Sequence, residues 1–78
     1  MNAPRPVQVV EGPPGHVKAL RTSRGLMEVD TVLEEWRIDD EWWREKISRR
    51  YAILALQDGQ MVTVFRDLVT GRWYLQEG

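Results

Sequence analysis

Apolar and turn residues follow one another in the last third of the chain in a pattern that predicts a β-hairpin. Residues 51–65, YAILALQDGQMVTVF, form two apolar runs that meet at Asp58-Gly59. This dipeptide is favoured in two-residue type I′ hairpin turns. A turn of that type fixes the register and places Leu56 opposite Met61.

A second hairpin is predicted to follow through a four-residue loop, residues 68–71, because Gly71 suits a positive φ. This loop length places Phe65 opposite Tyr74 and Arg66 opposite Trp73. We expect the Arg66 guanidinium to lie over the Trp73 indole as a cation–π pair, worth about 0.5–2 kcal/mol.

The predicted register makes both faces of this sheet apolar. One face carries Tyr51, Ile53, Ala55, Val62, Val64, Trp73 and Leu75, and the other carries Ala52, Leu54, Leu56, Met61, Phe65 and Tyr74. We assign Trp73 and Ile53 to the core. An antiparallel sheet with one solvated face would alternate apolar with polar residues. The second face is therefore expected to be covered by other elements, by a second copy of the chain, or by a partner.

The preceding segments predict shorter elements. Residues 16–22 predict a strand, and residues 27–38, rich in β-branched and apolar side chains, predict one bent strand or two strands joined by a bulge. The acids at 39–41 resemble the start of a helix, so we expect a short helix or helical turn over residues 40–46.

These elements predict one small, mainly β domain over residues 16–78. We expect an antiparallel meander that curls into an open barrel of about five strands, with one short helix or helical turn. Residues 1–15, which contain all four prolines, are expected to be a flexible arm in which residues 7–10 add to a sheet edge. Curling also limits the exposed edges of so small a sheet.

Composition adds limits on compartment and partners. The chain lacks cysteine and has no apolar run long enough for a signal peptide or membrane span, so we expect a soluble, cytoplasmic protein with no membrane contact. The net charge is −1, whereas nucleic-acid binders usually have a basic excess. Residues 28–45 contain eight acids and two arginines, so the remaining chain carries a positive excess.

The residues do not predict an enzyme. His16 is the lone histidine, and Ser23 and Ser48 have no histidine near them in the sequence, which excludes a serine nucleophile with its base. The consecutive acids at 39–41 lack the alternating spacing of a cation loop. We therefore predict no catalytic residues, no metal site and no cofactor.

The four tryptophans favour an interaction module, since large aromatic side chains anchor both small cores and protein interfaces. Neighbouring Trp42 and Trp43 must point in different directions, so one of them is available for contact. Our predicted partner-binding residues are Trp42, Trp43, Arg44, Phe65 and Tyr74.

Two alternatives remain open. Lys46, Arg49 and Arg50 adjoin aromatic residues, a combination that grips single-stranded nucleic acid through stacking and phosphate contacts. A homodimer would let two chains cover each other's second apolar face.

Several short motifs together resemble the C-terminal region of ImuB-type proteins, the inactive Y-family polymerase homologues of the bacterial mutasome. The resemblance covers about residues 26–76. Its motifs are Trp36-Arg37, Glu41-Trp42-Trp43, Arg50-Tyr51, Asp58-Gly59, Phe65-Arg66-Asp67 and Gly71-Arg72-Trp73-Tyr74-Leu75. The resemblance implies a non-catalytic accessory module that contacts partners in translesion synthesis or DNA repair.

Overall fold

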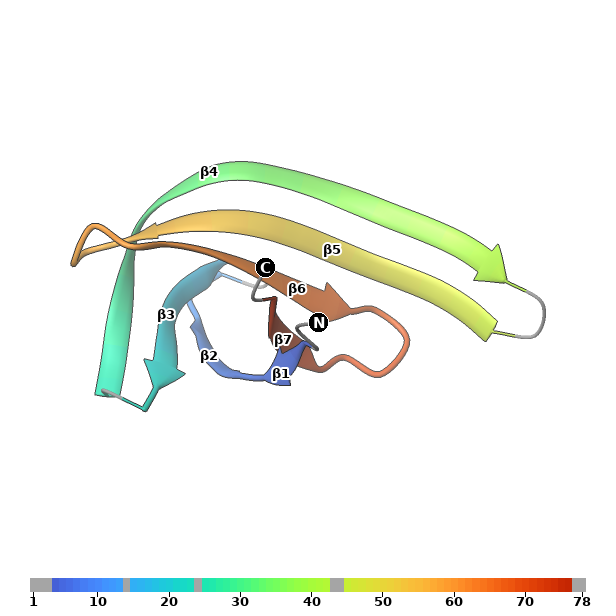
Figure 1. The fold of residues 1–78 in the computed structure, drawn as a ribbon, viewed down its shortest axis with the longest axis horizontal. Coiled ribbons are helices and arrows are strands. Elements are labelled where there is room, and N and C mark those ends of the chain that lie inside the picture. The colour runs from blue at the N-terminus through green and yellow to red at the C-terminus, as the bar shows by residue number, and fades with distance from the viewer. Residues whose placement is uncertain (1–3, 14, 24, 43–44, 77–78) are drawn as a thin grey trace.

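The fold is mainly β, as the sequence predicts. The structure, a computed structural model, describes residues 4–13, 15–23, 25–42 and 45–76. Its strands are β1 (Arg5–Pro6), β2 (Gln8–Glu11), β3 (Val17–Thr22), β4 (Gly25–Trp42), β5 (Glu45–Leu56), β6 (Met61–Asp67) and β7 (Trp73–Gln76). They form one antiparallel sheet in the order β1-β7-β6-β5-β4-β3-β2, curled into a half-barrel (Figure 1). The sheet therefore has seven strands where the sequence predicted about five.

The N-terminal strands connect the two borders of the sheet. β1 pairs with β7 at one border and β2 pairs with β3 at the other. Only Val7 separates them, and its amide donates to the Trp73 carbonyl at 3.1 Å. The expected pairing of residues 7–10 with a sheet edge is thus seen in β2.

The predicted helix over residues 40–46 is wrong in the described residues, because β4 extends to Trp42 and β5 begins at Glu45. Their pairing extends as far as Trp42 opposite Glu45. The acids find partners within the hairpin: Asp39 accepts a hydrogen bond from Ser48 Oγ at 2.6 Å, and Asp40 accepts one from the Glu41 amide. A helix of so few residues is marginal in water, whereas the described residues of this segment pair along one edge with the opposite strand.

β4 is one long strand bent by two irregularities. The register with β5 shifts between Val29 and Thr31 and again between Val32 and Glu34. Asp30 and Leu33 are the extra residues at these bulges, which increase the local twist and bend the strand. The bent or bulged strand predicted over residues 27–38 is confirmed. Figure 1 shows β4 and β5 running together beyond the other strands.

The first hairpin differs from its predicted register by one residue. The Gly59 amide donates to the Leu56 carbonyl at 2.9 Å, and the Leu56 amide donates to the Gln60 carbonyl at 2.8 Å. Three residues therefore form the loop, and Gly59, with φ of 89°, takes the left-handed position typical of such loops. As a result Ala55 pairs with Met61.

The second hairpin has the predicted register. Phe65 pairs with Tyr74 and Arg66 pairs with Trp73, and Gly71 has φ of 79°. The Arg66 guanidinium carbon lies 5.8 Å from the centre of the Trp73 ring. The predicted cation–π pair is confirmed.

The core lies on one face of the sheet. Leu20 of β3 packs against Leu54, Leu56 and Val64, and all four are buried. Trp73 packs against this cluster and donates from Nε1 to Glu11 at 3.2 Å, so its core assignment is confirmed. Ile53 lies on the opposite face, because the one-residue shift places the face of Tyr51 with that of Phe65; its core assignment is wrong.

Candidate interaction surface

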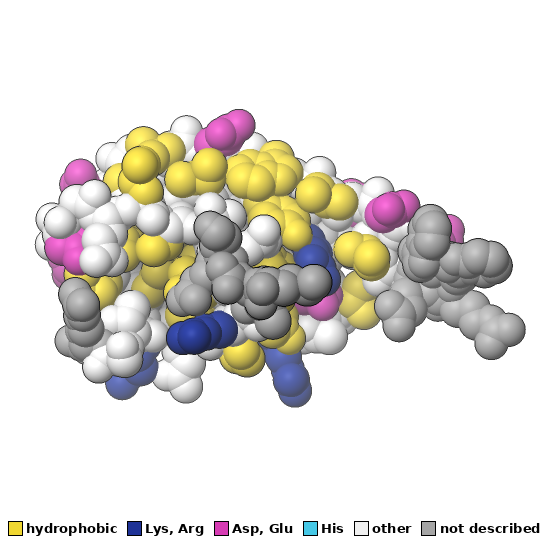
Figure 2. All heavy atoms as spheres, viewed as in Figure 1, with side chains coloured by type: hydrophobic (Ala, Val, Ile, Leu, Met, Phe, Trp, Pro, Cys, Tyr) yellow, Lys and Arg dark blue, Asp and Glu magenta, His cyan; other side chains and the backbone are white. Residues whose placement is uncertain are grey.

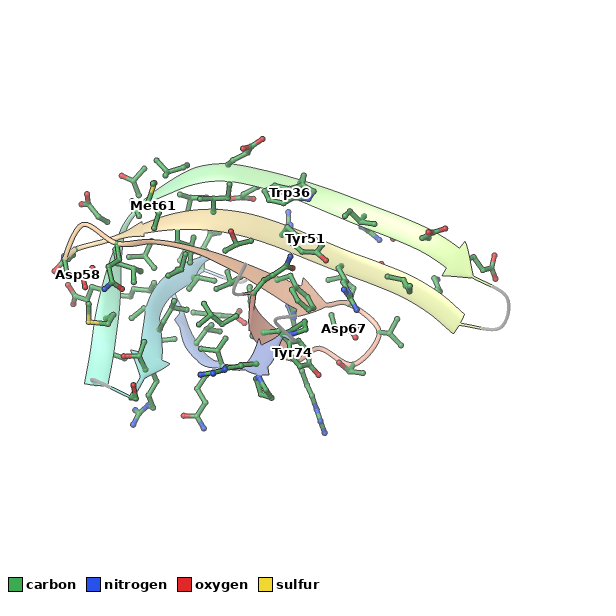
Figure 3. All side chains as sticks on the ribbon, viewed as in Figure 1. Trp36, Tyr51, Asp58, Met61, Asp67 and Tyr74 are labelled. Carbon is green, nitrogen blue, oxygen red and sulfur yellow. The ribbon has the colours of Figure 1, made fainter. Side chains whose placement is uncertain are left out.

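Four aromatic side chains, one from each of four neighbouring strands, form a continuous ladder on the face opposite the core. The register aligns Trp36 with Tyr51, Tyr51 with Phe65, and Phe65 with Tyr74. Successive ring centres are 5.3, 5.0 and 5.1 Å apart, and the Trp36 and Tyr51 planes are only 4° from parallel. Figure 3 shows Trp36, Tyr51 and Tyr74 one above another across β4, β5 and β7. We call this set the aromatic ladder.

The inner rings of the aromatic ladder, those of Tyr51 and Phe65, are buried against their neighbours. Phe65 is 2% exposed and Tyr51 is 8% exposed. The Arg49 guanidinium lies 4.6 Å from the centre of the Phe65 ring, and its Nη1 donates to Tyr51 Oη. Trp36, at the β4 end, remains 36% exposed. The ladder thus holds the strands together and presents one ring to solvent at its end.

Exposed apolar side chains gather on β4 next to that ring. Val32, Leu33, Trp36 and Ile38 are each more than a third exposed. In Figure 2 a row of hydrophobic side chains follows the upper border of the molecule, where Figure 1 places β4. We call these four residues the β4 strip. Clustered exposed apolar residues of this kind mark interaction sites more often than scattered ones do.

Two of the five predicted partner-binding residues, Phe65 and Tyr74, have described side chains. Phe65 and Tyr74 stack on each other in the aromatic ladder, and the buried Phe65 offers little contact area. The backbone of Trp42 ends β4, whereas its side chain, Trp43 and Arg44 lie outside the described residues. Sequence reasoning did not single out Leu33, Trp36 or Ile38 as exposed residues; their exposure follows from the end of β3–β4 pairing at Glu28, which has no clear sequence signal.

The predicted basic cluster is divided between the two faces of β5. Lys46 and Arg50 lie on the core side of the strand, whereas Arg49 lies on the ladder side, because side chains alternate along a strand. Arg50 sits in register between Arg37 and Arg66 on neighbouring strands. This arginine row is adjacent to the ladder but on the opposite face. The structure therefore does not assemble the predicted cluster into one basic and aromatic surface.

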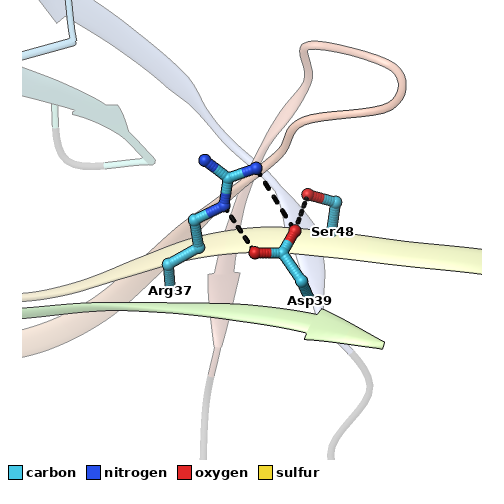
Figure 4. Close-up of polar contacts among 3 residues, drawn as sticks. All are labelled: Arg37, Asp39 and Ser48. Carbon is cyan, nitrogen blue, oxygen red and sulfur yellow. Dashed lines mark hydrogen bonds and ion pairs between the residues drawn. The ribbon is translucent and has the colours of Figure 1, made fainter. Parts of the chain in front are cut away.

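One carboxylate of the hairpin, that of Asp39, has two side-chain partners. Asp39 pairs with Arg37 Nε at 2.7 Å and accepts a hydrogen bond from Ser48 Oγ (Figure 4). The Ser48 hydroxyl, followed by the Arg37 guanidinium, lowers the pKa of Asp39 below its ordinary value. No cluster of three or more potential metal ligands occurs among the described residues.

An open cavity of about 680 Å³ lies at the end of the half-barrel between the β5–β6 turn and β3. Its apolar lining includes Leu20, Leu56, Val62 and Leu75, and Asp58 is the titratable residue among its described lining. Asp58 accepts a hydrogen bond from the Gln60 amide. A single capping carboxylate gives this cavity no acid–base pair.

Comparisons with family models, with curated proteins and with solved structures find no match. No helix with the length and apolar character of a membrane span occurs in the described part of the chain.

Proposed function

We propose that the protein is a non-catalytic protein-interaction module that binds its partner through the β4 strip and the neighbouring residues Trp42, Trp43 and Arg44. The observation that carries the proposal is the β4 strip itself. Every residue from Thr31 to Glu41 is exposed, yet the stretch contains large apolar side chains at four positions. Trp36 and Ile38 share the ladder side of β4, whereas Val32, opposite Leu54, lies on the core side. Packing of Trp36 and Ile38 against a partner would remove apolar surface from water at about 25 cal/mol per Å².

The residues of the ImuB resemblance support an accessory role in translesion synthesis or DNA repair. Four of its motifs, which are far apart in the sequence, contribute to two adjacent rungs of the sheet. Trp36, Tyr51, Phe65 and Tyr74 form the aromatic ladder, and Arg37, Arg50, Arg66 and Trp73 form the next rung on the other face. The four motifs thus correspond to a framework that positions β4 against β5.

Charge favours a protein partner over single-stranded nucleic acid. On strands β4 to β6, the ladder face carries Glu34, Asp40 and Asp67 against Arg49. Base stacking also needs open ring faces, and the inner ladder rings are covered by one another. The surface that the aromatic residues occupy is therefore suited to apolar contact with a protein and poorly suited to phosphates.

Capture of a partner from native lysate on the immobilised protein tests the proposal. We expect Ile38→Ser and Trp43→Ala to lose the captured protein while their thermal unfolding stays cooperative. Met61→Ser is the matched control, since Met61 is 70% exposed but lies on β6. The proposal fails if no protein is captured, or if Met61→Ser loses it equally.

A titration with a single-stranded oligonucleotide tests the nucleic-acid alternative. Affinity that falls steeply between 50 and 200 mM salt, on the order of 10³-fold or more, together with quenching of tryptophan fluorescence, would replace our proposal with that function. Sedimentation of the free chain tests the homodimer: a dimer that masks the β4 strip would make the partner a second copy.

A further inference from the structure

β4 has a long border that no described strand occupies. β3 pairs only with residues 25–28 of β4, and β5 pairs with its opposite side from Val29 to Trp42. Among the described elements, β4 contacts β3 and β5 alone. Beyond the second bulge, the segment from Glu34 to Trp42 pairs with β5 without a break in register. At about 3.3 Å per residue, this regular open edge is roughly 30 Å long.

The open edge is strongly acidic. Residues 34–42 include Glu34, Glu35, Asp39, Asp40 and Glu41 and a single basic residue, Arg37. Arg37 is paired with Asp39, and no ion pair engages the other four acids within the described residues. The unpaired carboxylates lie on both faces of the strand, because Glu34 and Asp40 alternate with Glu35 and Glu41. Charged edges of this kind prevent unspecific strand pairing, and they also select the charge of a strand that does pair.

The aromatic ladder ends at this edge with one ring face open. Each inner ring has an aromatic neighbour on both sides, whereas Trp36 stacks on Tyr51 alone within the described residues. A strand added beside β4 would place one side chain next to Trp36 on the ladder face. An arginine there would stack on the indole and lie near Glu34, two interactions that suit a planar guanidinium.

We infer that the edge of β4 from Glu34 to Trp42 binds a basic, extended segment of the partner protein as an added strand. This inference rests on the proposed function and names the chemistry of the partner. Backbone hydrogen bonds of the added strand supply affinity that is independent of sequence. The acids on both faces of β4 and the open face of Trp36 select lysine and arginine side chains.

A second copy of the chain does not suit this edge. Antiparallel pairing of two β4 edges would bring two acidic segments together, and like charges placed directly opposite each other destabilise a sheet. A nucleic acid is disfavoured by the same charges. The occupant with complementary charge is a basic peptide strand.

The test uses the full chain and a synthetic nine-residue peptide of alternating arginine and valine, blocked at both ends. Backbone amide exchange, followed by NMR, reports where the peptide binds. We expect new protection of alternate amides between Glu34 and Trp42, and a Kd that rises at least tenfold between 50 and 300 mM salt. Trp36→Ala is expected to weaken binding about threefold to fivefold, whereas Met61→Ala, at a more exposed position on β6, leaves it unchanged.

Two control peptides test whether binding depends on charge and on backbone pairing. A peptide of alternating glutamate and valine should not bind, and an arginine peptide with prolines in place of one valine and the neighbouring arginine should bind weakly, because one of two neighbouring amides faces β4 and proline cannot donate to a strand ladder. Equal binding of the proline peptide, or protection outside β4, would overturn the inference. A native partner that needs Ile38 and Trp43 but leaves β4 amide exchange unchanged would also overturn it while the proposed function stands. Failure to capture any partner would overturn the proposed function itself.

Discussion

Replacement of Phe65 by leucine is expected to destabilise the protein far more than its small change in apolar volume suggests. Phe65 is the inner ring that connects the two halves of the aromatic ladder, with Tyr51 at 5.0 Å and Tyr74 at 5.1 Å. It also lies beneath the Arg49 guanidinium. Leucine keeps an apolar side chain at this buried site and removes the ring interactions.

The expected loss in the free energy of unfolding follows from those contacts. Two aromatic pairs at about 0.5–1.5 kcal/mol each and one cation–π contact at about 0.5–2 kcal/mol give a loss of roughly 1.5–5 kcal/mol. A domain of this length has a total stability of about 4–12 kcal/mol at 0.05–0.15 kcal/mol per residue. Phe65→Leu should therefore remove a large share of the stability, and Phe65→Ala, at about 3–5 kcal/mol, is expected to approach complete unfolding.

Urea unfolding followed by tryptophan fluorescence measures this loss. With a slope of about 1–2 kcal/mol per M for a small domain, the midpoint of Phe65→Leu should fall by at least about 0.7 M. Met61→Ala is the control, because Met61 is on the same strand and the same face but 70% exposed; it should stay within about 0.5 kcal/mol of the parent chain. A Phe65→Leu midpoint equal to that of Met61→Ala would refute the stabilising role of the ladder.

Three further predictions test other parts of the fold. Gly59→Ala should lower the free energy of unfolding in urea by about 1–2 kcal/mol because of the positive φ of 89°. Gly12→Ala, in open space without a positive φ, should lower it less. Equal effects would contradict the three-residue loop. The lowered pKa of Asp39 means that its contribution to stability is present above the ordinary carboxyl pKa and is lost as the pH falls through its lower folded value. The difference in melting temperature between the parent chain and Asp39→Asn should therefore shrink on acidification, and a difference that grows would reverse the assigned shift. Trp73→Phe loses the hydrogen bond to Glu11 and should cost about 1–3 kcal/mol, more than Trp36→Phe at the exposed end of the ladder.

The two hairpins show why one register could be predicted and the other could not. A four-residue loop ending in Gly71 gave the correct pairing of Phe65 with Tyr74. Asp58-Gly59, by contrast, fits a two-residue turn and also a three-residue loop with glycine in the left-handed position. The difference of one residue moves a whole strand to the other face, so Tyr51 could not be placed beside Phe65 and the ladder stayed hidden.

The predicted helix failed because local and long-range signals conflict at the acids of residues 39–41. Consecutive acids favour a helix start when only neighbouring residues are considered. In the structure, Asp39 instead bonds to Ser48, nine positions away, across the hairpin. The exposure of Trp36 and Ile38 could not be predicted from the sequence either, because it depends on β3 leaving β4 after Glu28.

The position of the aromatic ladder explains how the hairpin can project from the sheet. At the ladder rung, β4 and β5 still have β6 and β7 beside them. Beyond Arg49 opposite Asp67, β4 and β5 are the only strands still paired in the described part of the chain. A two-stranded ribbon is marginally stable in water, so the projecting part depends on the packing at its root, where the ladder lies. A third strand added along the open edge of β4 would stabilise the same ribbon. Partner binding and ordering of the projecting hairpin would then be thermodynamically coupled, so that each favours the other. Substitutions in the buried ladder would weaken binding without touching the partner.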